Sequence, residues 1–163
     1  MPRTVTNQAL VGMGAAGLAS IYSPNHLTVT ADFTVAGWNE ALAHETFVVT
    51  GLVHVRMWIA VTGNVDSTAH GATVAFGNET VPAAYIAATD ETELDTGDLW
   101  YDATPTTAED AYATVVIDRV VNGLDIGYTI AGEALTTGSI AFHCVWEPLA
   151  LGATVVVGAG GIF

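Results

Sequence analysis

The sequence predicts an all-β fold, an antiparallel β-sandwich of jelly-roll-like type, and three observations favour it. From residue 26 onward, short runs of Val, Thr, Ile, Phe and Tyr alternate with Gly, Asn, Asp and Pro, as strands alternate with turns. Apolar residues at helical spacing are nearly absent there. About nine such runs in a chain of 163 residues are typical of a sandwich or barrel.

The chain begins with a segment of different composition, residues 1–26, which we expect to form an N-terminal arm or a short helix. Residues 8–22 are small and apolar and follow Arg3, so they faintly resemble a signal-peptide core. Free termini are normally disordered, and we therefore expect contacts with other subunits to hold this arm. A β-sandwich domain, 27–157, and a C-terminal tail, 158–163, complete the predicted organisation.

The strands of the domain are assigned from β-branched and aromatic content between turn residues. In chain order they are 27–35, 45–62, 72–77, 83–88, 98–101, 113–121, 124–131, 138–147 and 153–157.

The segment 45–62 shows the clearest two-residue alternation, which places successive side chains on opposite faces of a strand. It is too long for an ordinary sandwich strand, so we expect a bend or bulge near Gly51. The predicted core face comprises Phe47, Val49, Gly51, Val53, Val55, Met57 and Ile59, and the opposite face comprises Thr50, Leu52, His54, Arg56, Trp58 and Ala60.

Asn122-Gly123 lies between two β-rich runs and is the strongest local turn motif in the sequence. A type I′ turn needs positive φ at both central residues, and Asn-Gly supplies it. The motif therefore predicts a hairpin that joins 113–121 to 124–131.

Residues 89–112 hold eight of the 17 acidic residues and predict an acidic, loop-rich edge. Glu91, Glu93 and Asp95 alternate before a glycine, as in the opening of a calcium loop, but the bidentate Glu at position 12 is missing. They are candidate ligands for a structural cation, and a solvated loop is the competing interpretation.

Trp100 and Tyr101 lie beside Asp98 and Asp102 in the same acidic segment. Aromatic rings flanked by carboxylates can stack on a sugar and bind its hydroxyls, so these four residues form a candidate ligand-binding site. Aromatic residues in such a loop also commonly fill a subunit contact or cap the sandwich.

No motif for nucleophilic or zinc chemistry stands out. His143 and Cys144 are adjacent on a predicted strand and would point to opposite faces, so they cannot form a dyad. The four Ser lack a G-x-S-x-G elbow, and the five His lack H-x-x-x-H and H-E-x-x-H spacing. We expect no enzymatic activity and a buried, unreactive Cys144.

His54, Arg56 and Trp58 share one strand face and combine a titratable group, a cation and an aromatic ring. If this face looks outward, a homo-oligomer interface explains it most simply, and a buried Arg56 would then need a carboxylate partner. Ile162 and Phe163 end the chain, and we expect them to insert into a neighbouring subunit.

Charge and hydropathy restrict the partners. Three Arg, no Lys and 17 acids give a net charge of -14, which leaves no basic patch for nucleic acid. The acidic surplus suits high salt, and a codon bias against Lys explains it equally well.

A hydrophobic content of 51% favours burial between subunits. No uninterrupted apolar run of ~18 residues is present, so we expect no membrane span.

Three motifs carry a resemblance over roughly residues 44–157. They are FVVTGLVHVR (47–56), DLWYD (98–102) and GSIAFHCVWEPL (138–149). With these the chain resembles small β-rich virion proteins of tailed phages and related archaeal viruses, whereas residues 1–26 depart from the pattern.

The resemblance implies a structural protein of the virion, such as a capsid decoration, turret, spike-base or tail component. Its implied partners are copies of itself, in a trimer or other ring, and the major capsid or tail proteins. No cofactor is implied beyond the structural cation considered above. The alternative function is a carbohydrate- or receptor-binding module of a tail fibre or cell-surface assembly.

Overall fold

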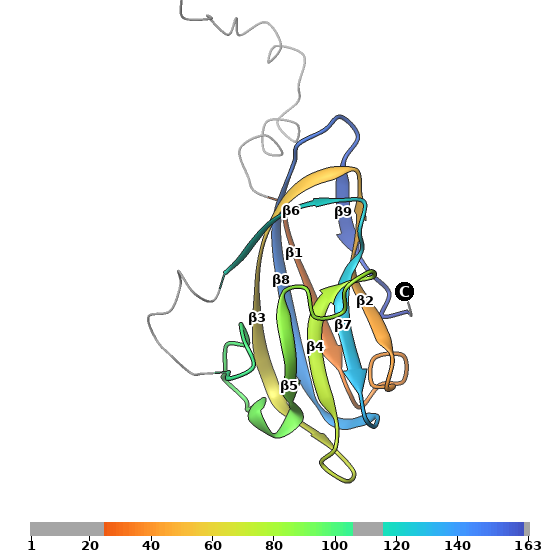
Figure 1. The fold of residues 1–163 in the computed structure, drawn as a ribbon, viewed down its shortest axis with the longest axis vertical. Coiled ribbons are helices and arrows are strands. Elements are labelled where there is room, and N and C mark those ends of the chain that lie inside the picture. Colours follow the sequence, from red (N-terminus) through yellow and green to blue (C-terminus); the bar gives the residue numbers. More distant parts are fainter. Residues whose placement is uncertain (1–24, 106–115, 162–163) are drawn as a thin grey trace, which may run out of the picture.

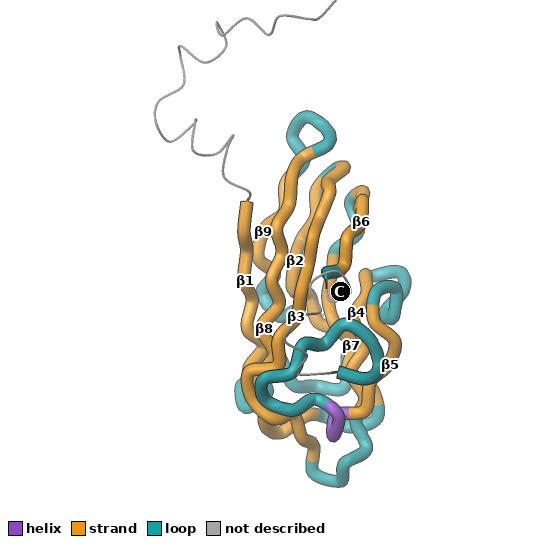
Figure 2. Tube along the Cα trace, turned by 90° about the vertical axis from the view of Figure 1, so that its left-hand side faces the viewer, coloured by secondary structure: helices purple, strands orange, loops and turns teal. Residues whose placement is uncertain are grey.

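A computed structural model of the chain describes residues 25–105 and 116–161 and contains two antiparallel sheets packed as a sandwich (Figures 1 and 2). The predicted all-β sandwich is therefore confirmed. The predicted arm up to residue 24 and the tail residues Ile162 and Phe163 lie outside the described residues. The strands are β1 (Asn25–Asp32), β2 (Ala43–Thr50), β3 (Leu52–Ser67), β4 (Thr73–Asn78), β5 (Ile86–Asp90), β6 (Ile117–Asn122), β7 (Ile126–Ala131), β8 (Leu135–Pro148) and β9 (Thr154–Val157).

The strand order is that of a jelly roll. One sheet has the order β1-β8-β3-β6 and the other β5-β4-β7-β2-β9. Strands pair from the two ends of the chain inward, β1 with β8, β2 with β7, β3 with β6 and β4 with β5, as in a long hairpin wrapped around a core. The ninth strand, β9, extends the second sheet by pairing with β2.

The chain changes sheet at Gly51, where a bend was predicted. Gly51 has φ +70°, and it separates β2 in one sheet from β3 in the other. The left-handed backbone at this corner suits glycine because it has no Cβ. The core face is confirmed on both sides of the corner, since Phe47, Val53 and Met57 are fully buried.

The hairpin predicted at Asn122-Gly123 is wrong. Only Gly123 of this pair has positive φ, and β6 and β7 lie in different sheets, where β6 pairs with β3 and β7 with β2 and β4. The turn is therefore a second corner between sheets. The amide of Gly123 donates to the carbonyl of Gly51 at 3.0 Å, which ties the two corners together.

Two other predicted segments, 98–101 and the tail from 158, also differ from their predicted assignments. The segment 98–101 forms no strand, only a single bridge between Leu99 and Ala60 of β3. The described part of the predicted tail continues along β2, because Gly158 donates to the carbonyl of Thr46 and Glu45 donates to that of Gly161. A short 3-10 helix, η2 (Glu91–Glu93), follows β5.

Aromatic rings from both sheets fill the core. Phe142 of β8 stacks on Tyr128 of β7 and on Phe76 of β4, with ring centroids 5.4 Å apart in each pair. The Tyr128 hydroxyl donates to the carbonyl of Trp38, and burial raises the pKa of this phenol well above its usual range. Among the described residues, no helix has the length and apolar content that a membrane crossing requires.

Candidate functional site

The outer face of the β1-β8-β3-β6 sheet carries three of the five sequence-predicted interface residues. His54, Arg56 and Trp58 lie on the same face of β3, opposite the buried Val55 and Met57. His54 and Trp58 are half-buried against neighbouring strands, and Arg56 is exposed. The predicted outward orientation of this row is therefore observed, whereas its role as an interface stays a prediction.

Three rings from three adjacent strands form a stack that we call the histidine–tryptophan patch: His26 of β1, His143 of β8 and Trp58 of β3. His143 and Trp58 face each other in the β3–β8 register, with centroids 5.0 Å apart and planes 4° from parallel. His26 lies 5.4 Å from the Trp58 ring. Because each ring restrains the next, the sheet presents a flat aromatic surface without rearrangement.

Burial and the nearby His26 lower the pKa of His143, so its neutral form is favoured in the patch. The hydroxyl of Thr28 lies 3.1 Å from Nδ1 of the same ring. A neutral ring fits a contact surface better than a charged one, because burial of an uncompensated charge is costly.

His54 lies between two carboxylates on the strands that flank β3. Its Nδ1 is 2.6 Å from Oε1 of Glu147 and its Nε2 is 2.6 Å from Oδ1 of Asp118. Hydrogen bonds to Glu147 and Asp118 raise the pKa of His54. The histidine therefore bridges β8 and β6 across β3.

Arg56 does not need the carboxylate partner that was expected if this side chain were buried. It is exposed and faces Asp118 only in the strand register. An exposed guanidinium is accessible to water, so no buried charge needs compensation.

Exposed apolar side chains cluster at one end of the same sheet, and we call Val120, Leu149 and Leu151 the apolar end. Val120 is opposite His54 in the β3–β6 register and is 63% exposed. Leu149 donates its amide to the carbonyl of Leu52, and this bond places the β8–β9 turn beside the start of β3. Leu151 at the tip of that turn is fully exposed. In the other sheet, the edge strand β9 also exposes Val156 and Val157.

The candidate sugar site does not form as predicted. Trp100 is fully buried, and its indole N–H donates to the Thr89 hydroxyl at 2.9 Å, so its ring has no free face on which a sugar could stack. Asp98 is also buried, whereas Tyr101 is half-buried and Asp102 is exposed. The alternative considered for this loop, in which an aromatic residue caps the sandwich, fits Trp100, because its large ring is buried against the core.

The cation candidates Glu91, Glu93 and Asp95 are separated as well. Glu93 and Asp95 are exposed, whereas Glu91 is fully buried and faces Asp66 and His70. Sequence reasoning missed Asp66 and His70 because they lie in a different segment from Glu91, and no local spacing joins them.

The geometry predicted for His143 and Cys144 is confirmed. The histidine lies in the outer patch and the cysteine is fully buried on the core face. Burial raises the pKa of the Cys144 thiol to about 12, so the reactive thiolate is scarce.

Comparison with known proteins gave one similar structure. No protein-family model matches the chain, and no curated protein matches it. A chain in the acidic stable capsid structure of Helicobacter pylori bacteriophage KHP30 aligns with a TM-score of 0.43 and 11% identity, over 82% of this chain and 95% of that chain.

Proposed function

We propose that the protein is a structural component of a tailed-virus particle, where it assembles with copies of itself and attaches to capsid or tail proteins. The jelly-roll strand order supports this proposal, because viral capsid domains are among the main users of that fold. Lectins and cupins use it too, so the fold alone does not select the function. The sequence resemblance to small virion proteins adds weight on the virion side.

The observation that carries the proposal is the position of the apolar end beside the histidine–tryptophan patch. Val120, Leu149 and Leu151 expose apolar surface on the same sheet that displays stacked rings. Interfaces combine such apolar anchors with aromatic and Arg side chains, and here Arg56 lies between the two groups. We infer that this sheet is the face that a second subunit covers.

The charge distribution supports the same arrangement. The acidic segment around residues 90–102 lies along the second half of β3, away from the apolar end, since Leu99 bridges to Ala60 and Leu94 accepts from Val65. Like charges at a subunit contact would repel, so solvent is their favourable environment.

The oligomer is tested by light scattering and native mass spectrometry of the full chain at several protein and salt concentrations. We expect a trimer or another closed ring for the wild type. In the double variant Leu149→Asp, Leu151→Asp the assembly should dissociate, because two carboxylates would be buried at the contact. The control is Val81→Asp, which alters an exposed apolar residue in the β4–β5 turn and should leave the assembly unchanged. A wild type that stays monomeric at all concentrations would contradict the proposal.

The particle assignment needs a separate measurement. Tailed particles purified from the source of this sequence should contain the chain at a fixed copy number relative to the main shell protein, as measured by quantitative peptide mass spectrometry. Absence of its peptides from purified particles, with abundant protein in the soluble fraction, would favour the alternative role as a carbohydrate- or receptor-binding module.

A further inference from the structure

One oxygen of a buried carboxylate at the acidic end of the sandwich lacks a hydrogen-bond partner. The Glu91 side chain is 0% exposed, its Oε1 accepts from the Ser67 hydroxyl at 2.6 Å, and its Oε2 has no hydrogen-bond partner. A buried acceptor without a donor is costly, and a buried ionised one more so. A missing positive group is the simplest physical explanation.

Two further ligand groups face the same point. One ligand atom each from Asp66, His70 and Glu91 lies within 4.8 Å of the others. Asp66 comes from the end of β3, His70 from the turn before β4 and Glu91 from η2. The end of β3 with its following turn and the helix η2 thus converge on a volume that one ion would fill.

Asp66 and His70 lie close together without an aligned hydrogen bond. Oδ1 of Asp66 lies 2.7 Å from Nδ1 of His70, yet this oxygen has no hydrogen-bond partner. Two ligands of one ion point their lone pairs at the metal and not at each other, and at zinc–ligand distances of about 2.0–2.1 Å in a tetrahedral site the two atoms would lie about 3.3 Å apart, so binding an ion requires only a small outward movement.

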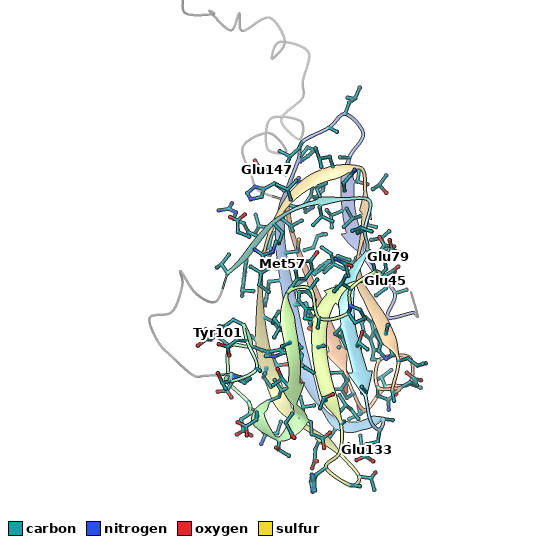
Figure 3. The ribbon with its side chains drawn as sticks, in the orientation of Figure 1. Glu45, Met57, Glu79, Tyr101, Glu133 and Glu147 are labelled. Atoms are coloured by element: carbon teal, nitrogen blue, oxygen red, sulfur yellow. The ribbon has the colours of Figure 1, made fainter. Side chains whose placement is uncertain are left out.

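The surrounding turn is built to hold His70 in place. His70 has φ +55°, the only positive φ of a non-glycine residue in the described ranges. The residues on either side of His70, Ala69 and Gly71, donate their amides to the Glu133 carboxylate of the β7–β8 turn. Figure 3 labels Glu133 at the lower end of the molecule. Glu133 therefore positions the turn and does not need to contact the ion.

No basic side chain of the described segments can take the place of the ion. The chain has no Lys. Arg56 is ten residues from Asp66 along β3, roughly 30 Å away at the rise of a strand, and Arg119 of β6 is opposite Val55, at the same distant part of β3. The Ser67 hydroxyl, which also contacts Glu133, has a single proton to share between two carboxylates. Apart from His70, the ionisable side chains around this point are the carboxylates of Asp66, Glu91 and Glu133.

We propose that Asp66, His70 and Glu91 bind a divalent transition-metal ion, with Zn²⁺ the best match, and that the ion pins the β3–β4 turn to η2. One imidazole and two carboxylates favour Zn²⁺ over Mg²⁺ and Ca²⁺, which prefer all-oxygen sites. The three protein ligands leave a fourth position to water.

The test is zinc titration of the chelator-treated full chain by isothermal calorimetry, together with thermal unfolding. We expect one zinc per chain and a melting temperature several degrees higher with zinc in excess. Glu91→Gln keeps the shape of the side chain and should weaken zinc binding at least tenfold. His70→Ala changes an exposed side chain and should do the same, so the conclusion does not depend on the folding of one variant.

The matched control is Glu93→Gln, which removes an exposed carboxylate two residues away in the same 3-10 helix and should bind zinc as the wild type does. The proposal is overturned if the wild type binds no zinc, if Glu91→Gln and His70→Ala retain wild-type affinity because the metal sits at other histidines, or if Ca²⁺ or Mg²⁺ binds more tightly than Zn²⁺.

Discussion

At the scale of single residues, His54 links protonation to stability. Its contacts with Glu147 and Asp118 raise its pKa in the folded chain above the unfolded value of about 6.5. Its protonated form therefore stabilises the fold fully below pH 6.5, and this contribution disappears as the pH rises through the folded pKa.

The variant His54→Gln should therefore show a pH-dependent loss. We expect its free energy of unfolding to fall by roughly 0.5–1 kcal/mol near pH 6, because both partners are solvent-exposed, and to change little at pH 9. Urea denaturation of both proteins at the two pH values measures this difference. Glu147→Gln, which removes one partner, should lose part of the same pH-dependent contribution. An equal loss at both pH values would mean that His54 acts through packing and not through charge.

Trp100 illustrates why residue type is a weak guide to position. Its neighbours Asp98, Tyr101 and Asp102 made the segment look solvent-exposed, but only Tyr101 and Asp102 reach the surface. The tryptophan differs because its large apolar ring gains more from burial than any neighbour, while Thr89 satisfies its single N–H.

At the scale of elements, Gly138 of β8 and Gly97 allow the backbone strain of replacing a glycine to be measured apart from the steric clash of the added Cβ. Gly138 has φ +99°, and a Cβ there would meet the carbonyl oxygen of Asn64 and lie 2.6 Å from Cα of Val65. Gly97 has nearly the same φ, +98°, but a Cβ there would meet nothing within 4 Å.

Gly97→Ala should therefore cost only the backbone term, about 1–2 kcal/mol, whereas Gly138→Ala should cost ~1–3 kcal/mol more because β3 and β8 must separate. Denaturant unfolding of the two variants measures both. Equal losses would show that the strands adjust to the extra methyl group without strain.

The elements also show what local sequence can and cannot predict. The two-residue alternation from Phe47 to Ile59 predicted the buried face correctly, because the side-chain period of a strand is a local property. The position of the turn at Asn122-Gly123 was predicted correctly, but its assignment to a hairpin was not. Turn residues indicate where the chain reverses, and they do not determine which sheet the next strand joins. The grouping of Asp66, His70 and Glu91 depends on long-range pairing in the same way, so neither sequence spacing nor local pattern revealed it.

At the scale of the whole molecule, the net charge of -14 makes repulsion between carboxylates a general destabilising effect. Added salt shortens the screening length from about 10 Å at 0.1 M to about 3 Å at 1 M. If the acidic bias is an adaptation to high salt, the melting temperature should rise steeply between 0.1 M and 2 M KCl. The measurement is made with chelator present, so that bound cations do not contribute. A flat response would leave codon bias as the explanation.

The central position of β8 has a consequence for how the protein is made. Both β1 and β3 pair with β8, yet β1 ends at Asp32 and β3 at Ser67, whereas β8 begins only at Leu135. During synthesis, the first sheet therefore stays incomplete until β8 has left the ribosome. Until then the early strands have unpaired edges and exposed apolar faces, a state prone to aggregation, so folding of this sheet is expected to be slow.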